Sequence, residues 1–204
     1  GVQLSPTPHP DLAAALVPGL DLVDGDAVPD DERNGLDDDG NGAVDEGAGH
    51  GTHVAGIVRL MAPDAAIMPI RVLDSDGGGD EWAVSQAMFW ASDHGAGIVN
   101  LSLGRHGSAT LLVKSVAALE RRDVLVVAAA GNDGRNRNER PASAPCALAV
   151  TGTDATDSVS TFATLGGWVD VAAPAEGIVS TFPFATQGYA SWDGTSMAAP
   201  FAAG

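Results

Sequence analysis

One short apolar run constrains the fold of this chain more than any other feature. Asp123–Ala130 (DVLVVAAA) is continuously apolar after its first residue and is eight residues long. A run of this length and β-branched composition, lying between helical patterns, predicts a strand buried on both faces, as strands in parallel sheets are. Ser108–Arg122, just before it, has apolar residues on one helical face, a serine that could cap the helix and two arginines suited to its end. The chain therefore predicts helix–strand alternation around a buried sheet.

The rest of the sequence continues this alternation. It predicts further helices at His50–Met61 and Asp80–His94, strands at Ile67–Leu73, Gly97–Leu103, Cys146–Thr151 and Trp168–Ala172, and a hairpin at Ile178–Ala190. This order predicts an α/β fold of three layers, with a mainly parallel central sheet and helices on both faces. No internal repeat or linker interrupts the pattern, so we expect residues 1–204 to form one domain.

The charge balance excludes some classes of partner. The chain has 10 Lys+Arg against 27 Asp+Glu, a formal net charge of −17, whereas nucleic-acid binding needs clustered basic residues. No apolar run approaches the length of a membrane span. Eleven of the 27 acids lie in residues 21–46 beside a single base, Arg33, so the negative charge is concentrated in one segment.

Three short segments carry residues suited to acyl transfer: 49–56, 128–132 and 194–200. Ser196 stands at a predicted helix start, where its hydroxyl can be exposed, but a serine hydroxyl needs a base to become a nucleophile. His50, flanked by glycines, is the candidate general base. Asn132 follows Gly131 and can donate its carboxamide N–H to a developing oxyanion. Each site lies where open α/β sheets place their chemistry.

Each residue also has a simpler interpretation. Ser196 alone could be a helix cap, and Asn132 could be a turn residue. His50 and His53 could bind zinc, but their i,i+3 spacing lacks the intervening glutamate and a third ligand. These separate explanations are weaker than a shared one, because the three segments occur together. We expect His53 to have a structural role rather than a catalytic one.

Together and in this order, the three segments resemble the subtilisin-like serine proteases, and the resemblance covers essentially the whole chain. It implies a serine endopeptidase that works through an acyl-enzyme, with His50 as base, Ser196 as nucleophile and Asn132 as oxyanion donor. It also implies polypeptide substrates, a propeptide and secretion. The alternatives are a non-catalytic binding scaffold of the same fold and a transferase that forms peptide bonds from the acyl-enzyme.

The family order of catalytic residues is Asp, His, Ser, and its aspartate typically precedes a glycine, with His-Pro-Asp-Leu some residues later. Here Gly1-Val2 is followed by His9–Leu12, so we expect the catalytic aspartate just before residue 1. We expect further helices after Gly204, which would make 1–204 an incomplete peptidase domain and the chain alone nearly inactive. Asp24 is the weaker alternative for the acid.

The acidic segment contains a cation-binding pattern. Residues 37–45 fit D-x-[DN]-x-[DN]-G-x-x-D, in which alternate oxygen ligands and a sixth-position glycine can wrap Ca²⁺. The predicted ligands are Asp37, Asp39, Asn41, Ala43 through its carbonyl, and Asp45. Ala48 stands where a bidentate glutamate is expected, and Glu46 could compensate. The alternative is a solvated acidic loop.

The resemblance implies that a substrate peptide lies between two extended backbone edges. On one side these are Gly77, Gly78 and Gly79, and on the other Ser102, Leu103 and Gly104. Small residues, Ala129, Ala130 and Gly131, would wall a roomy and apolar primary specificity pocket. An acidic rim predicts tolerance of basic residues a few positions before the cleaved bond; its residues are Asp76, Asp80 and Glu81.

Overall fold

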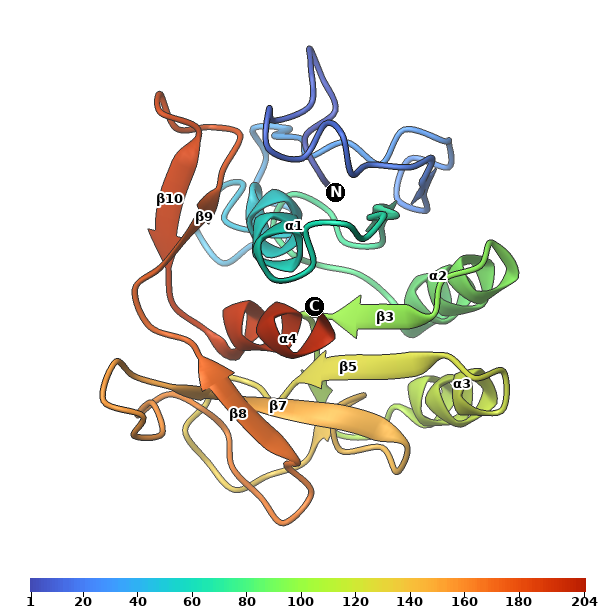
Figure 1. Ribbon diagram of the computed structural model, residues 1–204, viewed down its shortest axis with the longest axis vertical. Helices are drawn as coiled ribbons and strands as arrows, with labels where there is room; N and C mark the ends of the chain where they lie inside the picture. The colour runs from blue at the N-terminus through green and yellow to red at the C-terminus, as the bar shows by residue number, and fades with distance from the viewer. The chain divides into compact units, whose positions relative to one another are not determined.

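The computed structural model describes residues 1–204 (Figure 1). The contacts within the chain divide these residues into two compact units. The first unit comprises Gly1–Ala87 and Ser180–Ala190, and the second comprises Met88–Val179 and Ser191–Gly204. Helix α2 (Glu81–Asp93) begins in the first unit and ends in the second. No helix has the length and apolar character needed to cross a membrane.

The second unit is built on a four-stranded parallel sheet with the order β3-β5-β7-β8. Its strands are β3 (Ile98–Leu101), β5 (Leu125–Ala129), β7 (Ala147–Thr153) and β8 (Val171–Pro174). The apolar run identified from the sequence forms β5, an inner strand in which Val126 pairs with Val99 on one side and Ala147 on the other. Its residues from Val126 onward are buried, which confirms the prediction of a doubly covered strand.

Helices cover both faces of this sheet. Val127 and Ala129 of β5, with Val150 of β7, pack against the alanines at 198 and 199 in α4 (Thr195–Ala203). Small side chains on both sides let helix and sheet approach closely. Successive strand residues point to opposite faces, so Val126 and Ala128 face away from α4. Helix α3 (Thr110–Glu120) also packs on β5 (Figure 1), which confirms the predicted three-layer α/β fold.

Helix α3 differs from its prediction at the start. Ala109, not Ser108, occupies the N-cap position, and no side chain there bonds to the helix. Leu112, Val116 and Leu119 form the buried face, so packing rather than capping fixes this helix.

Two short ribbons complete the strands. Strand β4 (Arg105–His106) pairs antiparallel with β6 (Glu139–Arg140), which places His106 opposite Glu139. Strands β9 (Ile178–Thr181) and β10 (Tyr189–Trp192) pair with each other, as the predicted hairpin requires. The β4–β6 ribbon has no apolar pattern, and the sequence did not indicate it.

The first unit has little regular structure besides α1 (His50–Met61) and one parallel pair, β1 (Leu20–Asp21) with β2 (Ile70–Arg71). The strand predicted over Ile67–Leu73 is shortened to β2 and a single bridge between Leu16 and Ile67. A small core joins this region to α1; its residues are Val2, Leu12 and Ala55, with Leu16 and Ile67 against them.

An ion-pair network stabilises the start of the acidic segment. The buried Arg71 guanidinium lies 3.0 Å from Asp21, 2.5 Å from Asp24 and 3.5 Å from Glu32. Asp24, the weaker alternative for a catalytic acid, is therefore engaged with Arg71.

Candidate active site

Ser196 is the second residue of α4, and the turn before it requires glycine. Gly194 has φ 147°, a conformation that side-chain-bearing residues rarely adopt, and its N–H donates to the Ala175 carbonyl at 2.8 Å. Ser196 Oγ donates to the Ser102 carbonyl at 3.2 Å, while Ser102 Oγ donates to the Ser196 carbonyl at 2.6 Å. These bonds connect the end of β3 to the first turn of α4, so Ser196 is held at the carboxyl edge of the sheet.

Asn132 is oriented by the same helix start. Its Oδ1 accepts from the Thr195 N–H at 2.8 Å and from Thr195 Oγ1 at 2.9 Å. Thr195 Oγ1 in turn accepts from the Gly131 N–H at 3.0 Å. Because two donors fix the carboxamide oxygen, the orientation of the side chain is set and its Nδ2 group can donate to another acceptor. Thr195, fully buried, is a positioning residue that sequence reasoning missed.

Two hydrogen-bond donors converge beside Gly194. A Cβ built at this glycine would lie 3.5 Å from Asn132 Nδ2 and 3.8 Å from the Ser196 backbone N. Both donors therefore border one small region, at a helix N-terminus whose dipole favours negative charge. This arrangement suits the oxyanion of a tetrahedral acyl-transfer intermediate, as the sequence predicts.

His50 is the first residue of α1, and an aspartate fixes this helix start. Gly49, at φ 92°, precedes it and donates its N–H to Asp31 Oδ1 at 2.7 Å. Thr52 Oγ1 donates to Asp31 Oδ2 at 2.6 Å. Gly51 cannot carry a side chain, because a Cβ there would lie 1.8 Å from the Gly1 carbonyl oxygen. Asp31 lies among many other acids in the sequence, which gives no signal of this capping role.

The environment of His50 keeps its imidazole neutral. Burial lowers the pKa of His50 to about 4. A neutral imidazole at neutral pH is the form that can accept a proton. His53 is fully buried, with Nε2 3.1 Å from the Ala190 carbonyl oxygen, in keeping with a structural role.

The residues expected to bind substrate occupy different local structures. Gly77, at φ 84°, lies in a turn closed by Asp74, whose carboxylate accepts the Gly78 N–H at 2.7 Å. Gly79 follows this turn. On the other side, Ser102, Leu103 and Gly104 directly follow β3. Ala130 and Gly131 directly follow β5, the neighbouring strand.

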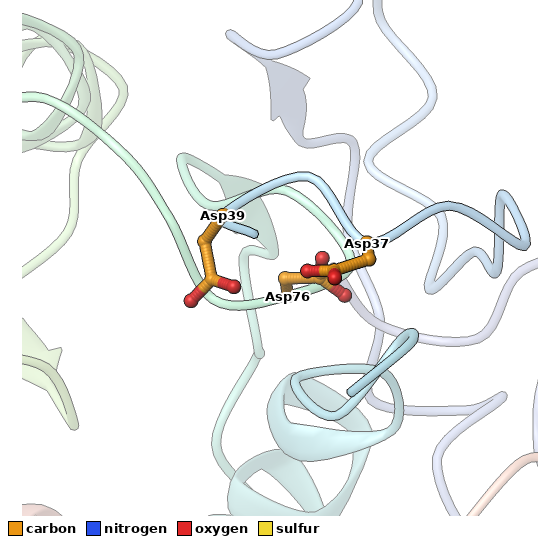
Figure 2. A group of neighbouring side chains, drawn as sticks. All are labelled: Asp37, Asp39 and Asp76. Atoms are coloured by element: carbon orange, nitrogen blue, oxygen red, sulfur yellow. The ribbon is translucent and has the colours of Figure 1, made fainter. Parts of the chain in front are cut away.

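Three carboxylates gather in the first unit (Figure 2). Ligand oxygens of Asp37, Asp39 and Asp76 lie within 4.8 Å of one another. Asp37 and Asp39 belong to the predicted cation-binding pattern, whereas Asp76 lies in the turn after β2, distant in the sequence. Carboxylates this close repel one another unless a cation or donors compensate. Asp76 does receive donors, the backbone N–H groups of Asp38 and Asp45.

The other predicted ligands make different contacts. Asn41 Nδ2 donates to Asp39 Oδ2 at 2.9 Å, so it adjoins the cluster through its amide. Asp45 accepts the N–H groups of Asn34 and Gly35 on its carboxylate. Ala43 is exposed, and its N–H donates to Asn41 Oδ1 at 2.7 Å.

Comparison with known proteins agrees with this geometry. The family model described as Peptidase_S8, subtilase family, matches residues 1–204. Thermitase from Thermoactinomyces vulgaris is 42% identical over 214 residues, covering 100% of this chain and 70% of thermitase. Subtilisin BL from Lederbergia lenta is 39% identical over 165 residues, covering 76% of this chain and 61% of its own length.

A thermophilic serine proteinase from Bacillus sp. (strain AK1) is 38% identical over 206 residues, which cover 96% of this chain and 47% of that protein. Among solved structures, a cold adapted subtilisin-like serine proteinase superposes with a TM-score of 0.84 at 32% identity, over 100% of this chain and 70% of that one. The chain thus spans 70%, 47% and 61% of the lengths of thermitase, the Bacillus proteinase and subtilisin BL. It belongs to the subtilase family of serine endopeptidases.

Proposed function

We propose that Ser196, His50 and Asn132 carry out hydrolysis of internal peptide bonds in polypeptide substrates. The observation that carries this proposal is the pair of donors, Asn132 Nδ2 and the Ser196 N–H, that borders one region at the nucleophile. A scaffold without catalytic function would have no need for a carboxamide held in this orientation.

The proposed reaction has two halves. Ser196 Oγ attacks the scissile carbonyl while His50 takes the hydroxyl proton, and the oxyanion is bound by Asn132 and the Ser196 N–H. His50 then gives the proton to the leaving amine, and the acyl-enzyme remains. Water, deprotonated by His50, attacks the ester, and His50 returns that proton to Ser196 Oγ as the acid product leaves.

The acid that orients His50 stays a prediction, with an aspartate expected ahead of Gly1. A carboxylate beside the His50 imidazole would favour its protonated form and raise the pKa of His50. Without it, turnover should fall by about 3 × 10⁴, the loss measured in subtilisin for this acid.

The acidic cluster suits calcium. Its donors are carboxylate oxygens, the hard ligands that Ca²⁺ prefers, and they come from two separate segments of the first unit. A cation there would join residues 37–39 to the turn at Asp76 and so stabilise a unit with little regular structure. We assign this calcium ion a structural role. Calorimetric titration tests the site, and absence of binding at millimolar Ca²⁺ would contradict it.

Two further features follow from the resemblance. The substrate would lie as an added strand between Gly77–Gly79 and Ser102–Gly104, in the manner of β-augmentation. The protein would act outside the cell, after release from its own propeptide. Fractionation of the producing culture tests the location.

The decisive experiment is cleavage of an unfolded protein by the full-length protein. New internal amino termini should appear, and Ser196→Ala should abolish them. Accumulation of ligated products instead of hydrolysed ones would favour the transferase alternative. Folded protein with no cleavage at all would favour the scaffold.

A further inference from the structure

An acidic side chain lies between the backbone segments expected to form the primary specificity pocket. Glu139 in β6 is only 5% exposed. A Cβ built at Gly104 would lie 2.6 Å from Glu139 Oε1, and one built at Gly131 would lie 3.2 Å from Oε2. Each carboxylate oxygen thus faces one glycine, and neither glycine carries a side chain that would cover it.

The neighbours of Glu139 compensate its charge only in part, through His106. His106, opposite it in the β4–β6 ribbon, has Nδ1 2.6 Å from Glu139 Oε2 and Nε2 3.4 Å from Asp133 Oδ2. Glu139 Oε2, Asp133 Oδ2 and His106 Nδ1 are all buried, yet none has a hydrogen bond of good geometry. Burying a carboxylate oxygen without a well-directed donor costs free energy. A cationic group that donates to these oxygens would therefore bind favourably.

Two nearby arginines, Arg137 and Arg140, do not fill this role. Arg137 Nη1 lies 3.4 Å from Asp133 Oδ2 and is itself substantially exposed. Arg140 directs its guanidinium to the Ser143 carbonyl. Burial raises the pKa of Glu139, and the charge of Asp133 adds to this, although the charges of His106 and Arg137 oppose it. The surroundings therefore disfavour the Glu139 anion until a further positive charge arrives.

The same glycines belong to segments that hold the catalytic groups. Gly131 precedes Asn132 and donates its N–H to Thr195 Oγ1. Gly104 lies two residues after Ser102, which exchanges hydrogen bonds with Ser196. A substrate side chain entering between these segments would meet Glu139 while its carbonyl lies at Ser196.

Resting on the function proposed above, we infer that Glu139, assisted by Asp133, selects substrates with lysine or arginine immediately before the cleaved bond. The ammonium or guanidinium group would donate to the carboxylate oxygens that face Gly104 and Gly131. Charge-assisted hydrogen bonds of this kind discriminate strongly against substrates that leave the anion unpaired. In this proposal the primary specificity pocket has small, apolar walls, as the sequence indicates, and the Glu139 carboxylate at its end.

The test compares tetrapeptide substrates that differ only in the residue before the cleaved amide: lysine, arginine, phenylalanine or glutamate. For the full-length protein, kcat/KM for lysine and arginine should exceed that for phenylalanine by roughly 10- to 100-fold. Glu139→Gln, a neutral variant of equal size, should remove most of this ratio. Glu176→Gln, which neutralises an exposed acid elsewhere in the second unit, should leave the ratio unchanged.

The outcomes separate this inference from the proposed function. Equal rates for phenylalanine and lysine, or a Glu139→Gln variant that slows every substrate by the same factor, would overturn the role of Glu139 while cleavage itself stands. No cleavage of any peptide and no labelling of Ser196 by a fluorophosphonate would instead overturn the proposed function. A ratio that falls only in Glu139→Gln supports the inference.

Discussion

The serine region of the second unit and the acidic segment of the first unit are held in place by different forces. Ser196 and Asn132 are fixed by hydrogen bonds between backbone and short side chains at the edge of a buried parallel sheet. Asp37 and Asp39 lie exposed in a loop, where the carboxylates mainly accept N–H groups from their own segment.

This difference predicts how each region responds to change. A site attached to a packed sheet keeps its geometry when ions are removed, because burial and backbone hydrogen bonds supply its stability. A loop of like charges depends on whatever neutralises it. Substitutions in the serine region should therefore alter turnover, and substitutions in the acidic segment should alter stability.

The largest effect is expected from removing the nucleophile. Ser196→Ala should lower kcat by about 10⁶, as measured for the same change in subtilisin. Because Ser196 is half-buried at a helix start, melting temperature and its dependence on calcium should stay close to wild type. If Ser196→Ala changed the calcium dependence of the melting temperature, the two regions would not be independent. Peptide hydrolysis measures kcat, and thermal melts with and without calcium measure the stability.

A smaller loss is expected from Asn132→Ala. Removing one oxyanion donor should lower kcat by about 10²–10³, the range found at the corresponding subtilisin donor, with KM little changed. The substitution also frees the Thr195 N–H and hydroxyl, so a Thr195→Val variant serves as comparison. If Asn132→Ala raised KM and left kcat intact, the residue would bind substrate rather than the oxyanion.

Calcium removal should act on stability and not on chemistry. At 100 times its dissociation constant a structural ion adds about 2.7 kcal/mol to the free energy of unfolding. Asp39→Asn should lose that increment in calcium and match wild type in chelator, whereas Asp64→Asn, a change at an exposed acid outside the cluster, should behave as wild type throughout. Equal calcium dependence of all three proteins would argue against the site.

The smallest effect concerns His50 and acid. Its folded pKa of about 4 lies below the ordinary value of 6.5, so the unfolded chain binds the proton first as the pH falls. Stability should therefore decline between pH 6.5 and 4, and less steeply in His50→Gln. Denaturant unfolding across this window measures the difference; identical slopes would show that His50 titrates normally in the folded chain.

The pH dependence of substrate choice gives a further comparison. The pKa of Glu139 is raised mainly by burial, so its charge should be lost at a higher pH than that of an ordinary glutamate. The charge of Asp133 adds to this rise, whereas the charges of His106 and Arg137, which also face Glu139, oppose it. The lysine-to-phenylalanine ratio of kcat/KM should therefore fall on acidification. A ratio independent of pH would contradict this.

The sequence predicted what depends on local pattern. The run that becomes β5, the glycine before Ser196 and the order of the three catalytic segments are all visible in short windows, and the fold and family follow from them. The candidate catalytic residues at strand ends and helix starts can be predicted for the same reason, because each lies within one of these short segments.

The contacts that the sequence did not predict are long-range. Asp76, predicted only as part of an acidic rim, joins Asp37 and Asp39 because the chain returns after β2. Asp31 caps α1 from within a run of acids. Glu139 sits in a segment of mixed charge, and its burial and its place opposite His106 are visible only in the folded chain. No periodicity marks such positions.

Covalent labelling at Ser196 tests the central claim most directly. A fluorophosphonate should react with the folded full-length protein at Ser196 alone, as located by peptide mass spectrometry. Labelling should be lost in Ser196→Ala and slowed strongly in His50→Ala, because the hydroxyl reacts only when a base removes its proton. A folded protein that is not labelled, or is labelled at another residue, would contradict the assignment of Ser196 as nucleophile.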